Sequence, residues 1–174
     1  MTYISDRLIE LFKEKKDPMF KSDIVDEQHK LLRSEWEAKK DTLPKSEIEK
    51  IEASMLELEF ESNIIIDKIL EVGDKMKILA LAEEFYTRLR TEIFETGEIE
   101  HLHITMASKV EEFKGLVNHD FYEDNSAPHK VAKEFITIVN HYGLLVFNEE
   151  EVTPEDILNP SESLTISLNF NKLL

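Results

Sequence analysis

The densest cluster of possible metal ligands in the sequence is formed by His101 and His103, which follow Glu98 and Glu100. Imidazole and carboxylate groups are common ligands of zinc. Histidines two residues apart share one face on a β-strand and could hold a metal together, but on a helix they point about 200° apart. The segment follows Gly97 and has the composition of a loop that leads into a helix. We therefore expect no metal site.

Residues 26–30, Asp-Glu-Gln-His-Lys, resemble the segment around the first histidine of a hemerythrin-like di-iron bundle. That family also needs two spaced histidines on one helix, a His-x-x-x-Glu motif and a final histidine with an aspartate. The sequence does not supply this set at matching spacing. We therefore expect His29 to be an exposed residue of an amphipathic helix.

No set of residues indicates an enzyme active site. Adjacent carboxylates occur at Glu83-Glu84, Glu111-Glu112 and Glu149–Glu151, and such runs are typical of solvated surfaces. There is no Gly-rich phosphate loop and no Gly-x-Ser-x-Gly turn. The chain has no cysteine, which rules out thiol catalysis, thiolate metal ligands and disulfides. We expect a protein that is not an enzyme, with no catalytic residue and no cofactor.

Arg88 and Arg90 are the most informative charged residues, because the acidic chain has only four arginines. An arginine pair beside aromatic residues suits a buried ion pair or an anchor of a protein interface. Equally, the two could flank a helix and pair with Glu84 or Glu92. The interface prediction takes in the surrounding segment and the alternating C-terminal strand: Phe85, Tyr86, Arg88, Leu89, Arg90, Ile93, Phe94, Leu164, Ile166, Leu168 and Phe170.

The composition indicates a folded, mainly helical protein. The 174 residues are 41% hydrophobic and include 10 Phe, enough to bury a core, while only 4 Gly and 5 Pro favour long helices. The formal net charge of −16 argues against direct contact with nucleic acid, because phosphate binding needs lysine and arginine. No apolar run reaches the roughly 18 residues that span a membrane, and the N-terminus lacks a signal-peptide pattern. We expect a soluble intracellular protein.

Apolar residues at helical spacing predict about five helices in residues 1–121. Pro18 should end the first helix, and Gly73 with Asp74 should separate a long third helix from the fourth. The predicted helices cover about 5–16, 22–40, 45–72, 76–97 and 105–117.

After residues 122–130, which have the composition of a linker, the pattern predicts β-structure. Strands are expected at 135–139, 144–147 and 163–170, with one capped helical turn at 153–158. The predicted fold class is mainly α with a small C-terminal β appendage: a helical bundle domain (1–121), a linker and a small β domain (131–174).

This order of parts resembles a subunit of the GINS complex, the four-protein accessory of the replicative DNA helicase. Two of its subunit types place a helical domain before a small β domain. Residues 11–18, Leu-Phe-Lys-Glu-Lys-Lys-Asp-Pro, resemble the short helix and proline break near the start of one type. Residues 51–69 correspond to its long central helix, 86–93 to its Tyr/Leu/Arg-rich stretch and 164–174 to its closing strand. Glu57, Glu59 and Glu61 stand where the family usually has basic residues.

The resemblance implies a non-catalytic scaffold in a heterotetramer that contacts helicase components in the nucleus, with no direct nucleic-acid contact from this chain. An alternative from another class is a small acidic inhibitor or immunity-type protein that blocks a basic nucleic-acid-binding site by charge, in the cytoplasm. Its binding should weaken steeply with salt, whereas an apolar interface should be less sensitive.

Overall fold

The computed structural model describes residues 3–95, 103–121 and 124–172. Its contacts divide the chain into two compact units. The hairpin unit is residues 8–75, and the sheet unit combines residues 1–7 with residues 76–174. This division differs from the one expected from the sequence, because residues 76–121 group with residues 131–174 and apart from the preceding helices. The expected fold class, mainly α with a small β-sheet near the C-terminus, is confirmed.

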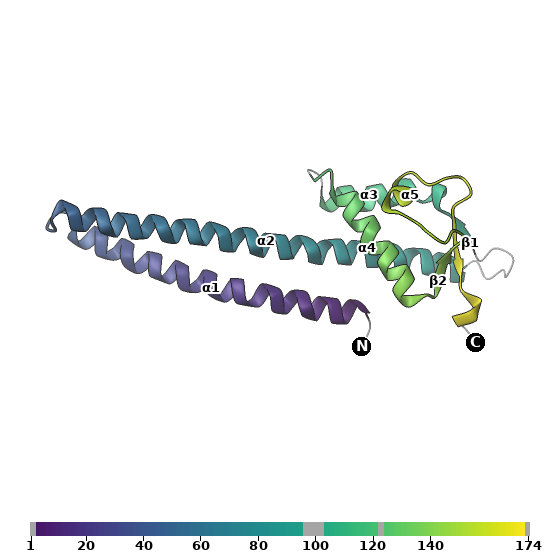
Figure 1. Ribbon diagram of the computed structural model, residues 1–174, viewed down its shortest axis with the longest axis horizontal. Helices are drawn as coiled ribbons and strands as arrows, with labels where there is room; N and C mark the ends of the chain where they lie inside the picture. The colour runs from purple at the N-terminus through teal and green to yellow at the C-terminus, as the bar shows by residue number, and fades with distance from the viewer. Residues whose placement is uncertain (1–2, 96–102, 122–123, 173–174) are drawn as a thin grey trace. The chain divides into compact units, whose positions relative to one another are not determined.

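The hairpin unit consists of two antiparallel helices joined by a short turn (Figure 1). Helix α1 spans Tyr3–Lys39 and α2 spans Lys45–Glu95, so α2 contributes to both units. In the turn, the amides of Thr42 and Leu43 donate to the carbonyl of Lys39 at 2.9 and 3.0 Å. Pro44 precedes α2, where its missing N–H costs no helical hydrogen bond.

The two expected interruptions of these helices are wrong. Pro18 lies inside α1, and Gly73 lies inside α2. Pro18 is buried, so packing of its ring offsets part of the hydrogen bond that it removes. A single glycine costs only about 1 kcal/mol relative to alanine in a helix, which a helix packed along its length tolerates.

Burial along the hairpin recurs with a seven-residue period. The half-buried and buried positions of both helices alternate in steps of three and four, which is the pattern of a coiled-coil seam. On α1 these positions are Leu8, Leu11, Lys15, Pro18, Ser22, Val25, His29, Leu32 and Trp36. On α2 they are Ile48, Ile51, Met55, Leu58, Ser62, Ile65, Ile69 and Val72.

Hydrogen bonds across the seam set which residues lie side by side. Lys75 Nζ donates to Glu14 Oε1 at 3.1 Å, and Trp36 Nε1 donates to Glu52 Oε1 at 3.1 Å. Between them His29 Nε2 lies 3.3 Å from Glu59 Oε1. His29 is therefore a half-buried seam residue and not the exposed residue that we expected.

The sheet unit places the end of α2 with two further long helices and a small sheet (Figure 1). Strand β3 lies between β1 and β2 and is antiparallel to both, with Ile166 opposite Ile104 and Phe147. In chain order the unit has the end of α2, one strand, two helices, a second strand, the short helix α5 and the central strand β3. After α2 the elements are β1 (His103–Thr105), η2 (Met106–Ser108), α3 (Val110–Asp120), α4 (Ala127–Tyr142), β2 (Leu145–Phe147), α5 (Pro154–Leu158), β3 (Thr165–Leu168) and η3 (Phe170–Lys172).

The strand expected at 135–139 is wrong, because these residues belong to α4. Buried residues recur along α4 at helical spacing, at Val131, Phe135, Ile138 and Val139, so the local β-branched run is overridden by the helical period. Gly143 then ends the helix in the left-handed conformation, with φ of 61°. Residues 127–130 form the first turn of α4 and not a linker, while 122–123 lie outside the described residues.

The third strand, β1, lies where we expected a loop. Three residues carry little periodicity, and β1 exists through its pairing with β3, some sixty residues away along the chain. The capped turn expected at 153–158 is confirmed as α5. The side chain of Thr153 accepts from the Asp156 amide, and the Asp156 carboxylate accepts from the Thr153 amide.

Three phenylalanine rings form the centre of the sheet unit. The Phe85 ring makes edge contacts with the Phe113 and Phe135 rings, with both pairs of centroids 5.0 Å apart. All three side chains are fully buried, and they come from α2, α3 and α4. Because one aromatic cluster joins three helices, it fixes how these helices pack in the unit.

Candidate protein-interaction surface

Most of the interface residues predicted from the sequence are core residues of the sheet unit. Their side chains are buried within this unit, so they offer little surface for a partner to contact. The seven buried residues are Phe85, Tyr86, Leu89, Ile93, Leu164, Ile166 and Leu168. Phe94 and Phe170 are half exposed and remain surface residues.

Arg88 pairs with neighbours on the surface of the sheet unit. Its guanidinium lies 2.5 Å from Glu84, one turn earlier on α2, and 3.3 Å from Glu112 on α3. These carboxylates raise the pKa of Arg88 above its already high ordinary value. Of the two alternatives left open by the sequence, the structure shows the helix-flank pairing for Arg88.

Arg90 lines a shallow surface pocket of the sheet unit with Tyr86, Tyr142 and Leu144. Burial raises the pKa of the Tyr86 hydroxyl, and the nearby positive charge of Arg90 opposes that shift. An interface role for Arg90 stays a prediction.

Exposed apolar residues concentrate instead on the hairpin unit. Among the described residues, eleven of the thirteen exposed large hydrophobic side chains belong to it. Leu31, Leu56 and Phe60 are the most prominent, with 72%, 68% and 69% of their surface exposed. The full set on the hairpin is Ile9, Phe12, Met19, Phe20, Ile24, Leu31, Leu56, Phe60, Ile64, Ile66 and Leu70.

Six of these residues share one side of the hairpin, and Leu56, which follows the seam residue Met55, is the one nearest the turn between the helices. The other five lie farther from the turn and form what we call face A: Ile9, Phe12, Met19, Ile66 and Leu70. Each follows a seam residue directly, as Phe12 follows Leu11 and Ile66 follows Ile65. Each is therefore rotated about 100° in the same sense from that seam residue. Since the two helices run in opposite directions, residues displaced in the same sense from the seam emerge on the same side of the pair.

The opposite side of the hairpin, face B, is defined by Ile24, Leu31 and Ile64. Each comes directly before a seam residue, at Val25, Leu32 and Ile65, and is therefore rotated about 100° in the opposite sense from face A. A shallow groove on face B is lined by Gln28, Leu31, Leu32, Ser54, Glu57, Leu58 and Glu61.

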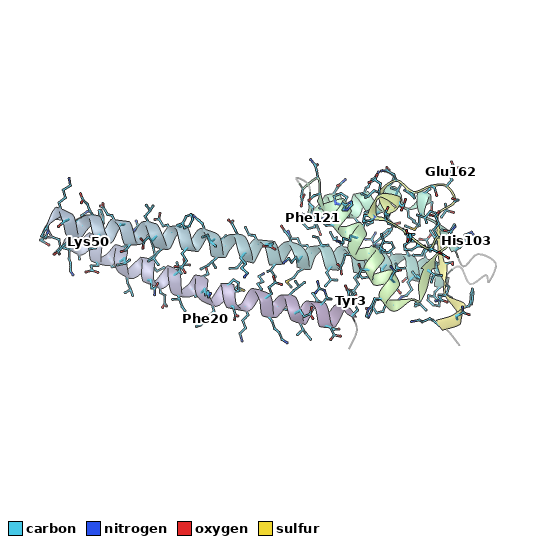
Figure 2. The ribbon with its side chains drawn as sticks, viewed as in Figure 1. Tyr3, Phe20, Lys50, His103, Phe121 and Glu162 are labelled. Atoms are coloured by element: carbon cyan, nitrogen blue, oxygen red, sulfur yellow. The ribbon has the colours of Figure 1, made fainter. Side chains whose placement is uncertain are left out.

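Phe20 and Phe60 lie at the outer edges of the hairpin. The Phe20 side chain lies on the side of α1 turned away from α2 (Figure 2). Apolar residues therefore occur on both faces and both edges of a two-helix structure that uses only its seam internally. The periodic signal for the seam was present in the sequence, but the contiguous exposed set becomes visible only when the helices are paired.

In the described part of the chain, no group of three or more His, Asp or Glu side chains is placed to hold an ion. His103 is an exposed residue of β1, while His101 lies outside the described residues together with Glu98 and Glu100. The helices of the described ranges include none with the length and apolar character to cross a bilayer.

Comparison with known proteins does not extend these observations. No protein-family model, no curated protein and no solved structure matches the chain.

Proposed function

We propose that this chain is a non-catalytic subunit of a multi-protein assembly and that its hairpin unit is the surface that docks other proteins. The concentration of exposed apolar residues on the hairpin carries the proposal. Monomeric proteins expose single apolar side chains freely but seldom contiguous groups of them. A helix that carries apolar residues on a second side has a second packing partner.

The magnitude favours association. Covering a half-exposed Leu, Ile or Phe side chain contributes about 1 kcal/mol at roughly 25 cal/mol per Å² of apolar surface. Five such residues on face A contribute on the order of 5 kcal/mol, and the other exposed residues of the hairpin add to this. That is enough to matter against the loss of translational and rotational freedom on association, which costs about 4–15 kcal/mol.

A protein partner is favoured over nucleic acid. The connection from β2 to β3, residues 148–164, has no lysine or arginine and carries Glu149, Glu150, Glu151, Glu155, Asp156 and Glu162. Such a segment repels phosphate. The α4 helix is also engaged at its surface by α1, since the Tyr3 hydroxyl donates to Glu134 at 3.0 Å.

The GINS-like accessory of the replicative helicase is the specific form of this proposal that the sequence resemblance suggests. It would make the chain one of four subunits, with helicase components as further partners. The hairpin would then be the surface that meets its sister subunits.

Affinity purification of the tagged full chain from its native cell, followed by mass spectrometry, tests the proposal. Three proteins of similar size recovered with helicase subunits would support the GINS-like form. The same purification is repeated with Phe12→Lys/Met19→Lys on face A and with Leu31→Lys/Ile64→Lys on face B.

We expect at least one of the two hairpin variants to lose partners that the native chain recovers. Ser34→Lys is the matched control, because Ser34 is an exposed polar residue of the same hairpin. Identical recovery with the native chain and both variants would contradict docking through the hairpin.

A further inference from the structure

Face A of the hairpin carries charges of opposite sign along its two borders. On α1 the exposed residues Lys13 and Lys16 lie beside Phe12, and on α2 the exposed residues Asp67 and Asp74 lie beside Leu70. None of these four takes part in an ion pair within the described residues. Face A therefore has an apolar centre, a basic border on one helix and an acidic border on the other.

The borders lie at matching heights along the hairpin. The Lys75–Glu14 and His29–Glu59 contacts place residues of α1 beside residues of α2 whose numbers add to about 88. Lys13 therefore lies at the height of Asp74. The other end of face A is marked by two polar residues. Asp23 lies seven residues after Lys16 on α1, and Asn63 lies seven residues before Leu70 on α2.

Consider a twofold axis that runs parallel to the hairpin and over face A. Rotation about this axis brings the basic border of each copy to the acidic border of the other. Such a rotation places a second hairpin on face A with its α2 against the first α1, antiparallel and at the same height. The Lys13 border of each copy then meets the Asp74 border of the other, and the contact occurs twice, as in any isologous interface. All neighbouring helices in the resulting set of four are antiparallel, which is the up-down arrangement of four-helix bundles.

The shape of face A also fits this arrangement. Gly73 follows the seam residue Val72 on face A, and a Cβ built on it would meet no atom within 4 Å. In the rotated copy the Phe12 side chain, which is 59% exposed, lies at nearly the height of Gly73. A bulky side chain is thus set opposite an open position, as in the knobs-into-holes packing of helices.

We propose that face A binds a second copy of this chain and that two hairpins form an antiparallel four-helix bundle. The inference rests on the proposed function, because it names the occupant of one face of the docking hairpin. Face B stays available to other proteins in this arrangement. A dimer formed by face A buries the largest apolar group of the hairpin and neutralises its four unpaired border charges.

The mass of the full chain in solution is the first test. Sedimentation equilibrium at micromolar concentrations should give twice the 20.3 kDa of one chain. Phe12→Lys and Gly73→Leu should each weaken the dimer by tenfold or more. Gly73→Leu is the sharper variant, because leucine favours the helix and meets open space in the single chain, so it leaves folding intact.

The control variant is Leu31→Lys, which changes an apolar residue on face B that is even more exposed than Phe12. We expect it to leave the dimer unchanged. Far-ultraviolet circular dichroism verifies that each variant keeps its helix content, so that loss of the dimer is not loss of the fold.

Charge reversal tests the geometry itself. Lys13→Glu/Lys16→Glu makes both borders acidic, and Asp67→Lys/Asp74→Lys makes both basic, so each variant alone should dimerise about tenfold more weakly. Mixed together they should form a heterodimer, because each border of one variant then meets an opposite border of the other. The variant with all four changes should dimerise as the native chain does.

A native chain that sediments as a monomer at tens of micromolar would overturn the inference. So would a dimer lost in Leu31→Lys but kept in Phe12→Lys, or charge variants that fail to associate when mixed. These failures are separate from failure of the proposed function: a monomer whose captured partners depend on the hairpin overturns the second copy alone, and hairpin-independent capture overturns docking by the hairpin.

Discussion

Phe85 is the single residue on which the sheet unit depends most. Its ring touches those of Phe113 and Phe135 and is fully buried. We expect Phe85→Ala to lower the free energy of unfolding by about 3–5 kcal/mol, because it removes the buried ring and leaves a cavity between three helices. Urea unfolding followed by circular dichroism measures the change.

Phe94→Ala is the matched control for this prediction, since Phe94 lies on the same helix with half of its surface exposed. Its truncation should cost less than about 1 kcal/mol. Equal losses in the two variants would show that the phenylalanine cluster does not hold the unit together.

Asp156 links the stability of the sheet unit to pH. Its carboxylate accepts hydrogen bonds from the Thr153 amide at 2.7 Å and the Thr153 hydroxyl at 2.6 Å, and these lower the pKa of Asp156 below its ordinary value. A lowered pKa in the folded state stabilises the fold above the unfolded pKa of about 4, and this stabilisation is lost as pH falls through the folded pKa.

We therefore expect Asp156→Asn to melt at a lower temperature than the native protein at pH 7. The difference should shrink toward zero between pH 5 and pH 2, because the native carboxylate becomes protonated there. Thermal melting of both proteins across this range is the measurement. A difference that stays constant with pH would rule out the charged cap as its source.

Among the described helices, α1 is the one whose local stability is limited by an internal proline, Pro18. It lies inside a 37-residue helix and removes one main-chain hydrogen bond to Glu14. Pro18→Ala should raise the free energy of unfolding by about 1–2 kcal/mol. The gain is smaller than the roughly 3 kcal/mol cost of an internal proline because the buried ring is lost from the seam.

Hydrogen exchange of the amides around residue 18 measures this effect directly, and protection should rise in Pro18→Ala. Ser22→Ala is the control, because it changes the next seam position without restoring a hydrogen bond. A fall in protection in Pro18→Ala would mean that the ring contributes more by packing than it costs the helix.

The helices could be predicted where their periodic faces are buried, and their ends could not. The apolar repeat of residues 45–72 was correctly assigned to a helix, and the alternation of residues 163–170 to a strand, which spans Thr165–Leu168. The residues around Pro18 and Gly73 carry end signals that are locally valid. Packing along the hairpin outweighs these signals, because each seam residue adds burial that the continued helix preserves.

The candidate site could not be located from local sequence for a related reason. Phe85, Leu89 and Ile93 form an apolar run beside two arginines, which suits an interface and a core equally well. Which of the two applies depends on whether α3, α4 and the sheet cover that face, and they do. The exposed residues of the hairpin have the same composition but lack such a cover within the chain.

The net charge of −16 is a property of the whole molecule, and it makes the salt dependence of association informative. We expect self-association to weaken no more than about tenfold between 0.1 and 1 M NaCl, because salt screens the border charges while the apolar centre is retained. Sedimentation at several salt concentrations measures this. A hundredfold or larger loss would mean that the border charges, and not the apolar centre, hold the dimer together.

The sequence alone determined the helical character of the chain, its acidity, the capped turn at Thr153 and the final strand, because each follows from composition or from short-range periodicity. Only the tertiary structure decided that residues 135–139 are helical, that β1 exists, and that most of the predicted interface residues are core. Burial is a property of what packs against a residue, and the residues that pack against Phe85 or leave Phe12 uncovered lie far away along the chain.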